Sequence, residues 1–312
     1  MNRATVLLPL LASVAVLGAC QTSSGPAADS SSASSAAGLA PARVPSDAQS
    51  APAGLPGTLS VLTFEPGKAI TLLRHTQTTS FGTAGHGDVL AVSSRDGRHV
   101  ALISSSDPEL GAPGDLVVVD AGGQRHVLAH KVTWGGGVAP VWTPDGRAVV
   151  LRGVRYEASG GGHASAGLTG NAAYLAYSVD GAMLAYAATD TSVVVGPVGG
   201  GSRRVVDISN FPECSDYACP FAVQAVSNDG NYVALGDGNT DLGTVTDAHI
   251  VLDTRSRKAV DLTAFGDVQH IWFTASGGAI IHTTHDLRVV DTAWHVTGTF
   301  PAPGNGTLLY TA

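Results

Sequence analysis

The stretch Val141-Trp142-Thr143-Pro144-Asp145-Gly146-Arg147 joins two short apolar runs through an Asp-Gly pair. Such a pair favours a tight turn, because glycine adopts positive φ at no steric cost and the aspartate side chain bonds to nearby main-chain groups. Apolar runs on both sides of the turn predict a β-hairpin. Degraded copies of this stretch recur along the chain, so the hairpin is the expected building unit of the fold.

Six segments share the pattern when they are aligned on the turn glycine, namely Gly97, Gly146, Gly181, Gly230, Gly277 and Gly306. Aspartate precedes this glycine in the first four copies, and Ser or Thr stands three residues before it in the first five. All six copies carry a branched aliphatic residue three positions after the glycine, namely Val100, Val149, Leu184, Val233, Ile280 and Leu309. Agreement at a turn position and at a core position indicates an internal repeat.

Further strand-like runs, such as Leu116 to Asp120 and Arg125 to Thr133, give about four strands per unit. The chain has 44% hydrophobic and only 13% charged residues, which favours strands over long helices with charged outer faces. Six units in residues 55–312 average about 43 residues each, within the ~40–45 of a four-stranded propeller blade. The sequence therefore predicts an all-β fold, a β-propeller of six four-stranded blades.

The two ends of the predicted propeller are expected to meet in one blade. The last copy runs from Gly306 to Ala312, and the segment Leu59 to Phe64 can supply its missing outer strand. Two spacings are short, with 35 residues from Gly146 to Gly181 and 29 from Gly277 to Gly306, against 47 to 49 elsewhere. We expect these two blades to have lost a strand, and the glycine-rich residues 160–167 to form a loop.

The segment Trp-Thr-Pro-Asp-Gly-Arg, followed by an apolar strand, resembles the blade motif of the TolB-like (WD40-like, PD40) propellers. The resemblance covers most of residues 55–312, although only the second copy matches in full. It implies a non-catalytic scaffold that binds an envelope protein or a peptidoglycan-associated partner. The α/β domain that precedes the propeller in TolB has no counterpart here, so the resemblance does not imply a translocation activity.

Residues 1–19 have the features of a signal peptide, with Arg3 followed by the apolar run Val6 to Val16. The run has roughly half of the ~20 residues that a spanning helix needs. Leu17-Gly18-Ala19-Cys20 resembles the bacterial lipobox, which implies cleavage before Cys20 and acylation of its thiol, for example with palmitate. An ordinary signal peptide with a chance cysteine is the alternative.

Residues 20–54 are rich in Ser, Ala and Pro, and they cannot bury enough apolar surface to offset the entropy of ordering them. We expect a disordered tether. The protein is then exported and lipid-anchored to the bacterial cell membrane or outer membrane, facing the periplasm or the exterior. Its net charge of −8, without a cluster of Lys or Arg, argues against nucleic acid as a partner.

Cys214 and Cys219 remain once Cys20 is acylated, and an oxidising compartment favours a disulfide between them. A redox-active or metal-binding pair is the alternative, but the Cys-x-x-Cys spacing is missing.

Two segments resemble metal sites in part. Asp237, Asn239 and Asp241 place oxygen atoms at alternate positions, as a calcium loop does. Leu242 stands where the EF-hand needs glycine and Ala248 where it needs glutamate, so a solvated strand connection is favoured and calcium is the alternative.

His282, His285 and Asp286 invite a zinc interpretation. Residues three apart on a strand face opposite sides, so a polar strand end is favoured. The glycine-rich residues 160–167 contain neither a phosphate-binding Gly-Lys-Ser/Thr nor a Gly-x-Ser-x-Gly elbow, and we assign no catalytic or cofactor-binding residue.

Three functions stay open. A binding scaffold is favoured because no acid–base pair or metal cluster emerges from the sequence. A secreted propeller enzyme of the lactonase, lyase or glycosidase kind is the first alternative, since propellers also carry active sites in their central channels. A ligand or cation sensor centred on residues 237–247 is the second. The breaks in the repeat direct attention to the loops at 155–170, 210–220 and 237–247.

Overall fold

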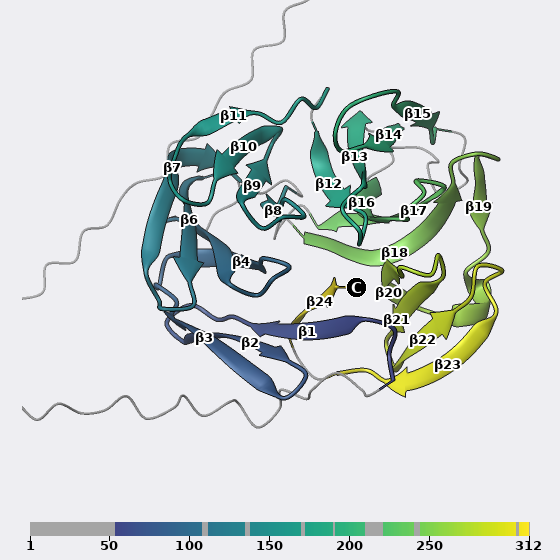
Figure 1. Ribbon diagram of the computed structural model, residues 1–312, viewed down its shortest axis with the longest axis horizontal. Helices are drawn as coiled ribbons and strands as arrows, with labels where there is room; N and C mark the ends of the chain where they lie inside the picture. The colour runs from purple at the N-terminus through teal and green to yellow at the C-terminus, as the bar shows by residue number, and fades with distance from the viewer. Residues whose placement is uncertain are drawn as a thin grey trace, which may run out of the picture. The chain divides into compact units, whose positions relative to one another are not determined.

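A computed structural model describes residues 54–107, 112–134, 138–169, 172–189, 191–209, 221–239, 244–303 and 306–311, all within one structural unit, Ala42–Ala312. In this described part of the chain, 24 strands form six four-stranded antiparallel sheets arranged as a ring (Figure 1). One short 3-10 helix, η2, spans Thr263–Phe265. None of the described helices has the length and hydropathy to cross a membrane.

Three sheets come first along the ring. One contains β4 (Asp88–Ser93), β5 (His99–Ser104), β6 (Pro113–Asp120) and β7 (Arg125–Thr133). The next contains β8 (Val141–Trp142), β9 (Ala148–Leu151), β10 (Val154–Glu157) and β11 (His163–Ser165). The third contains β12 (Ala173–Tyr177), β13 (Met183–Thr189), β14 (Ser192–Pro197) and β15 (Arg204–Asp207).

Three more sheets complete the ring. One contains β16 (Phe221–Val226), β17 (Tyr232–Asn239), β18 (Thr244–Asp253) and β19 (Lys258–Val260). The next contains β20 (Val268–Phe273), β21 (Ala279–Thr283), β22 (Asp286–Val290) and β23 (Val296–Pro301). The last contains β24 (Thr307–Thr311), β1 (Thr58–Thr63), β2 (Ala69–Arg74) and β3 (Gln77–Thr83).

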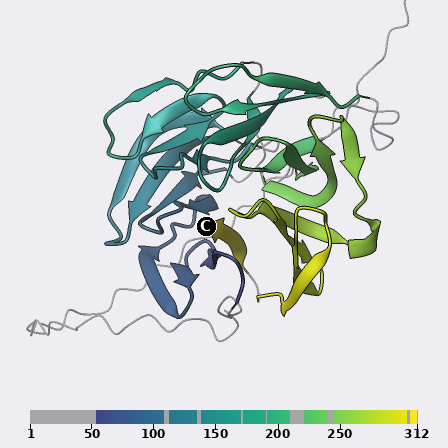
Figure 2. The same ribbon diagram turned by 45° about the vertical axis from the view of Figure 1, so that its right-hand side comes forward.

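The first strand of each sheet lies near the centre of the ring and the fourth lies at its rim (Figure 1). The turned view in Figure 2 shows the same sheets fanning around the axis. This arrangement confirms the predicted β-propeller of six four-stranded blades.

Both ends of the described chain share the closing sheet. β24 pairs with β1 in a register that sets Tyr310 opposite Leu59. The predicted completion of the last blade by an N-terminal strand is confirmed. The expectation that Leu59 to Phe64 forms the outer strand was wrong, because β24 is innermost, β1 is second and β3 is the outer strand.

Gly306 does not occupy the turn position that its alignment with the other five glycines predicts. Gly306 precedes an innermost strand, whereas the five earlier glycines lie in turns between first and second strands. Leu309 is therefore only half-buried in β24. A turn glycine followed by an apolar strand looks the same in sequence at either place.

The expectation that two blades lack a strand was wrong. The β8–β11 sheet fits a short spacing by shortening its strands to 2, 4, 4 and 3 residues. Its outermost strand β11 lies inside the glycine-rich residues 160–167, and all three of its side chains are exposed, so it carries no apolar signal. The β20–β23 sheet likewise has four strands.

Hydrogen bonds explain the repeated turn. The Thr143 hydroxyl donates to Asp145 Oδ1 (2.6 Å), which also accepts the Arg147 N–H (3.1 Å), and Thr143 Oγ1 accepts the Ala148 N–H (3.0 Å). Gly146 completes the turn with a φ of 67°. The same Ser-to-Asp bond recurs at Ser94, Ser178 and Ser227 with distances of 2.6, 2.6 and 2.7 Å. The repeated aspartates therefore shape turns, as the sequence indicates.

Apolar side chains fill the space between neighbouring sheets. The aligned aliphatic residues of the first five copies lie in second strands and are at most 3% exposed: Val100, Val149, Leu184, Val233 and Ile280. One cluster joins Ala185 and Val195 of the third sheet to Val223 and Leu235 of the next. The core is thus distributed around the ring, between the blades.

Candidate functional site

The innermost strands enclose an axial cavity of about 210 Å³. All six of these strands contribute to its wall, and its larger side chains include Trp142, Tyr177, Trp272, Phe273 and Tyr310. The polar groups in its wall decide what this cavity can bind or catalyse.

Arg95 forms part of the wall of this cavity. It occupies the second position of the Ser94-Arg95-Asp96-Gly97 turn, and it donates to the main-chain oxygens of Tyr177 and Val179, each at 2.9 Å. These acceptors belong to the sheet two places farther around the ring, so the guanidinium spans the inner end of the β8–β11 sheet. Burial lowers the pKa of Arg95, and the nearby Asp180 carboxylate opposes that shift.

Gln224 joins two innermost strands inside the cavity. Its side-chain nitrogen donates to the Gln269 carbonyl (3.0 Å), and its oxygen accepts the Ile271 N–H (2.8 Å). The amide thus links β16 to β20 as a main-chain pairing would. Trp142 makes a similar connection, because its indole N–H donates to the Val92 carbonyl of β4 at 2.9 Å.

His270 lies against the Trp272 ring, with 4.4 Å between ring centroids, and Trp272 stacks on His282 at 6.1 Å. Removal from bulk water lowers the pKa of His270 from 6.5 to about 3, and the neighbouring His282 adds to the shift. The pKa of His282 is also lowered by burial, although Asp286 opposes this. His270 is therefore neutral near pH 7.

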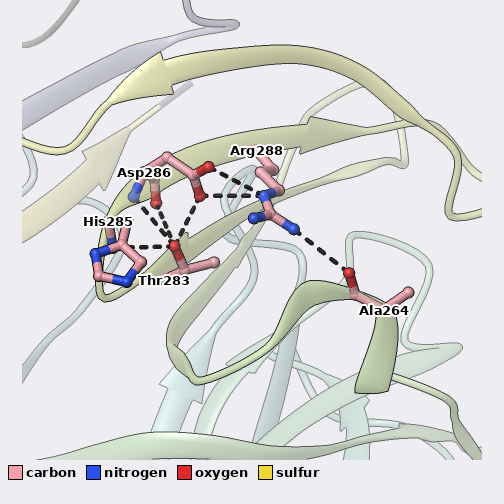
Figure 3. Close-up of polar contacts among 5 residues, drawn as sticks. All are labelled: Ala264, Thr283, His285, Asp286 and Arg288. Atoms are coloured by element: carbon pink, nitrogen blue, oxygen red, sulfur yellow. Dashed lines mark hydrogen bonds and ion pairs between the residues drawn. The ribbon is translucent and has the colours of Figure 1, made fainter.

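Asp286, one of the three residues considered for zinc, stabilises a turn with Thr283 and Arg288 (Figure 3). The Thr283 hydroxyl donates to Asp286 Oδ1 at 2.7 Å, and Arg288 Nε donates to both carboxylate oxygens at 3.1 and 3.2 Å. His285 is exposed between β21 and β22, whereas His282 faces Trp272. No three His, Cys, Asp or Glu side chains in the described part of the chain are grouped as metal ligands.

Other predicted sites lie partly or wholly outside the described residues. Cys20, Cys214 and Cys219 are outside them, and so is Asp241. The backbone of Asp237 and Asn239 lies in β17. Lipidation, the disulfide and calcium binding stay predictions.

The sequence did not reveal three clefts that border the short β8–β11 sheet. Two lie against the β4–β7 sheet and have volumes of about 430 and 440 Å³, and one of about 290 Å³ lies against the β12–β15 sheet. The first contains His99, Asp120, His126, Arg147 and Glu157. The short spacing from Gly146 to Gly181 was the available signal, because shorter strands fill less of the space between blades.

Comparisons with known proteins concern the fold. No protein-family model matches the chain, and no curated protein matches it. The crystal structure of TolB from Acinetobacter baumannii aligns with 14% identity and a TM-score of 0.47, covering 81% of this chain and 65% of that one. Dihydro-heme d1 dehydrogenase NirN in complex with DHE aligns with 15% identity and a TM-score of 0.44, covering 80% and 66%. This chain thus spans slightly less than two thirds of the length of each.

Proposed function

We propose that this protein is an exported lipoprotein whose propeller binds an envelope protein or a cell-wall component and catalyses no reaction. The observation that supports a binding role is that the polar side chains of the axial cavity form hydrogen bonds within the protein. Arg95 and Gln224 bond one sheet to another, and His270 is held neutral by a pKa of about 3. A general acid or base must exchange protons near the working pH, which these groups are not placed to do.

The anchor proposed at Cys20 rests on the Leu-Gly-Ala-Cys segment and on the preceding apolar run. Growth with a clickable palmitate analogue should label the wild-type protein and transfer it to the membrane fraction. The Cys20→Ser variant should lose both the label and the membrane fraction. Equal labelling of the variant would refute the anchor.

Binding is tested by cross-linking the lipidated protein in its own envelope, followed by affinity recovery and identification of the cross-linked species. Specific enrichment of one envelope protein or of peptidoglycan fragments, absent from a parallel recovery with an unrelated lipoprotein, is the expected result. Turnover of a lactone or glycoside panel by the purified protein, without an enriched partner, would replace the scaffold with an enzyme.

A further inference from the structure

One inter-blade cleft has a composition that differs from the rest of the molecule. This cleft, the β7–β10 groove, has a volume of about 440 Å³ and is lined by Leu128, Ala129, His130, Lys131, Val132, Thr133, Leu151, Arg152, Val154, Tyr156 and His163. Strands β7, β10 and β11 lie side by side there (Figure 1). Its volume falls within the ~300–1,000 Å³ of small-molecule sites.

The charged side chains that line the groove are basic. Lys131 and Arg152 are cations, and His130 and His163 add two imidazoles. The Asp115 carboxylate, which is not part of the lining, lies 3.0 Å from His130 Nδ1. The whole chain has a formal net charge of −8 and only three lysines. A cationic groove on an acidic protein concentrates a positive potential where an anion can enter.

A β-bulge places the first pair of basic residues. Gly114 pairs with Val132 and Leu116 with Ala129, so His130 and Lys131 together oppose the single residue Asp115. Asp115 stabilises the bulge, because its carboxylate accepts the Lys131 N–H (3.2 Å) and lies 3.0 Å from His130 Nδ1. Bulges redirect side chains and are common next to functional sites.

Lys131 and Arg152 both have an unusual backbone conformation. Lys131 has a φ of 54° and Arg152 a φ of 48°, in a region that residues with a Cβ seldom adopt. Arg152 and Gly153 form the two-residue turn between β9 and β10, where Asn, Asp or Gly is the usual first residue. Arg152 Nε donates to the Thr133 carbonyl at 3.2 Å, which directs its guanidinium toward β7.

The rest of the groove's wall is mainly apolar or aromatic. Leu128, Leu151 and Val154 supply apolar surface, and the Tyr156 ring lies 5.9 Å from that of His163. A flat apolar body fits such a wall, while its charged head meets the cations. We infer that the β7–β10 groove binds a small organic anion, with a carboxylate or phosphate group at Lys131 and Arg152. This inference is independent of the proposed scaffold function.

Asparagine substitutions separate binding from structure. Asparagine tolerates positive φ, so Lys131→Asn and Arg152→Asn remove the charge without adding backbone strain. Lys131→Asn should keep the wild-type melting temperature, and Arg152→Asn should stay folded with a slightly lower one, because it loses the donor to the Thr133 carbonyl. Arg257→Asn is the matched control, because Arg257 is an exposed cation with a φ of 57° that lies outside the groove.

Calorimetric titration of the full-length protein at low ionic strength, with phenylacetate and with phenyl phosphate, measures the binding. We expect at least one probe to bind, at least tenfold weaker binding in Lys131→Asn and in Arg152→Asn, and wild-type affinity in Arg257→Asn. The stronger of the two probes identifies the preferred head group, and either preference supports the site. No binding of either probe, unchanged affinity in the two groove variants, or an equal loss in the control would overturn it.

Discussion

Arg125 forms a bidentate ion pair with Asp88, with nitrogen–oxygen distances of 2.8 and 2.9 Å. The Asp88 side chain is 0% exposed and that of Arg125 is 35% exposed. Asp88 also accepts the Gly85 N–H at 2.7 Å. The pair ties the outermost strand of the β4–β7 sheet to the start of its innermost strand, next to the connection from the closing sheet.

Removing the arginine should leave a buried carboxylate without its cation. Arg125→Ala should lower the free energy of unfolding by about 3 kcal/mol, at the low end for a broken buried pair because Arg125 is partly exposed. Urea denaturation measures the change. Arg98→Ala is the control: its pair with Asp96 is 3.9 Å long with the arginine 80% exposed, and the loss should be under about 0.5 kcal/mol. Equal effects of the two variants would contradict this account.

Arg95→Ala should lower the free energy of unfolding by about 2–3 kcal/mol, because the main-chain oxygens of Tyr177 and Val179 lose a charged donor. Arg95→Lys keeps the charge but cannot reach both acceptors in the same geometry, so we expect an intermediate loss. Thermal unfolding of the two variants measures the order. A melting temperature for Arg95→Ala equal to the wild type would show that these two hydrogen bonds do not stabilise the ring.

His270 should make stability fall as the solution is acidified. Its folded pKa of about 3 lies below the ordinary value of 6.5, so between these two pH values the unfolded chain binds a proton that the folded chain does not. The contribution is fully present above pH 6.5, and about 2–3 kcal/mol of it should be lost by pH 4.5. Denaturation at pH 7 and 4.5 measures this difference.

The His270→Gln variant should show a smaller loss of stability between these two pH values than the wild type. His285→Gln, altered at an exposed turn position, should retain the wild-type loss. An identical pH dependence in the wild type and His270→Gln would contradict the assignment.

The repeated turn should depend on its aspartate. Asp145→Ala removes the acceptor for the Thr143 hydroxyl and the Arg147 N–H and should cost about 1–2 kcal/mol. The pKa of Asp145 is lowered, first of all by the Thr143 hydrogen bond, which shows that the bond favours the ionised carboxylate. In the degraded copy, Ser276 makes one 3.0 Å contact with Thr274, so Ser276→Ala should cost less. Chemical denaturation of both variants gives the comparison.

The two later cysteines should form a disulfide in the exported protein. Thiol titration of the denatured, unreduced protein should detect no free cysteine, and reduction should release two thiols from Cys214 and Cys219. Two titratable thiols before reduction would contradict the pairing. The Cys214→Ser variant, which leaves a single thiol, calibrates the titration.

Local chemistry made most of the fold predictable. The turn between Thr143 and Ala148 is stabilised by side chains no more than five residues apart, so its sequence pattern suffices to identify it. Strand β11 has no such pattern, because its exposed side chains reflect main-chain pairing with β10 alone. The order of strands within the closing sheet also has no local signal, so the sequence alone does not place Gly306 before the innermost strand.

The site depends on contacts between distant segments. Arg95 and Tyr177 are 82 residues apart in sequence, and no periodic pattern relates them. The β7–β10 groove arises from the shortness of one sheet and from a bulge in its neighbour, and a bulge changes the direction of side chains without changing the residues. Candidate residues could therefore be named from sequence only where they are close together along the chain.

The pairing of β24 with β1 has a consequence for the order of folding. Thr311 and Thr58 lie 253 residues apart, yet they share a hydrogen bond in the closing sheet. Until residues 307–311 have been synthesised and have paired with β1, this strand has an unpaired edge. A chain that ends shortly before Thr307 would keep the unpaired edge of β1. Such an edge can pair with strands of other molecules and promote aggregation. Residues 307–311 therefore protect the β1 edge from pairing with strands of other molecules.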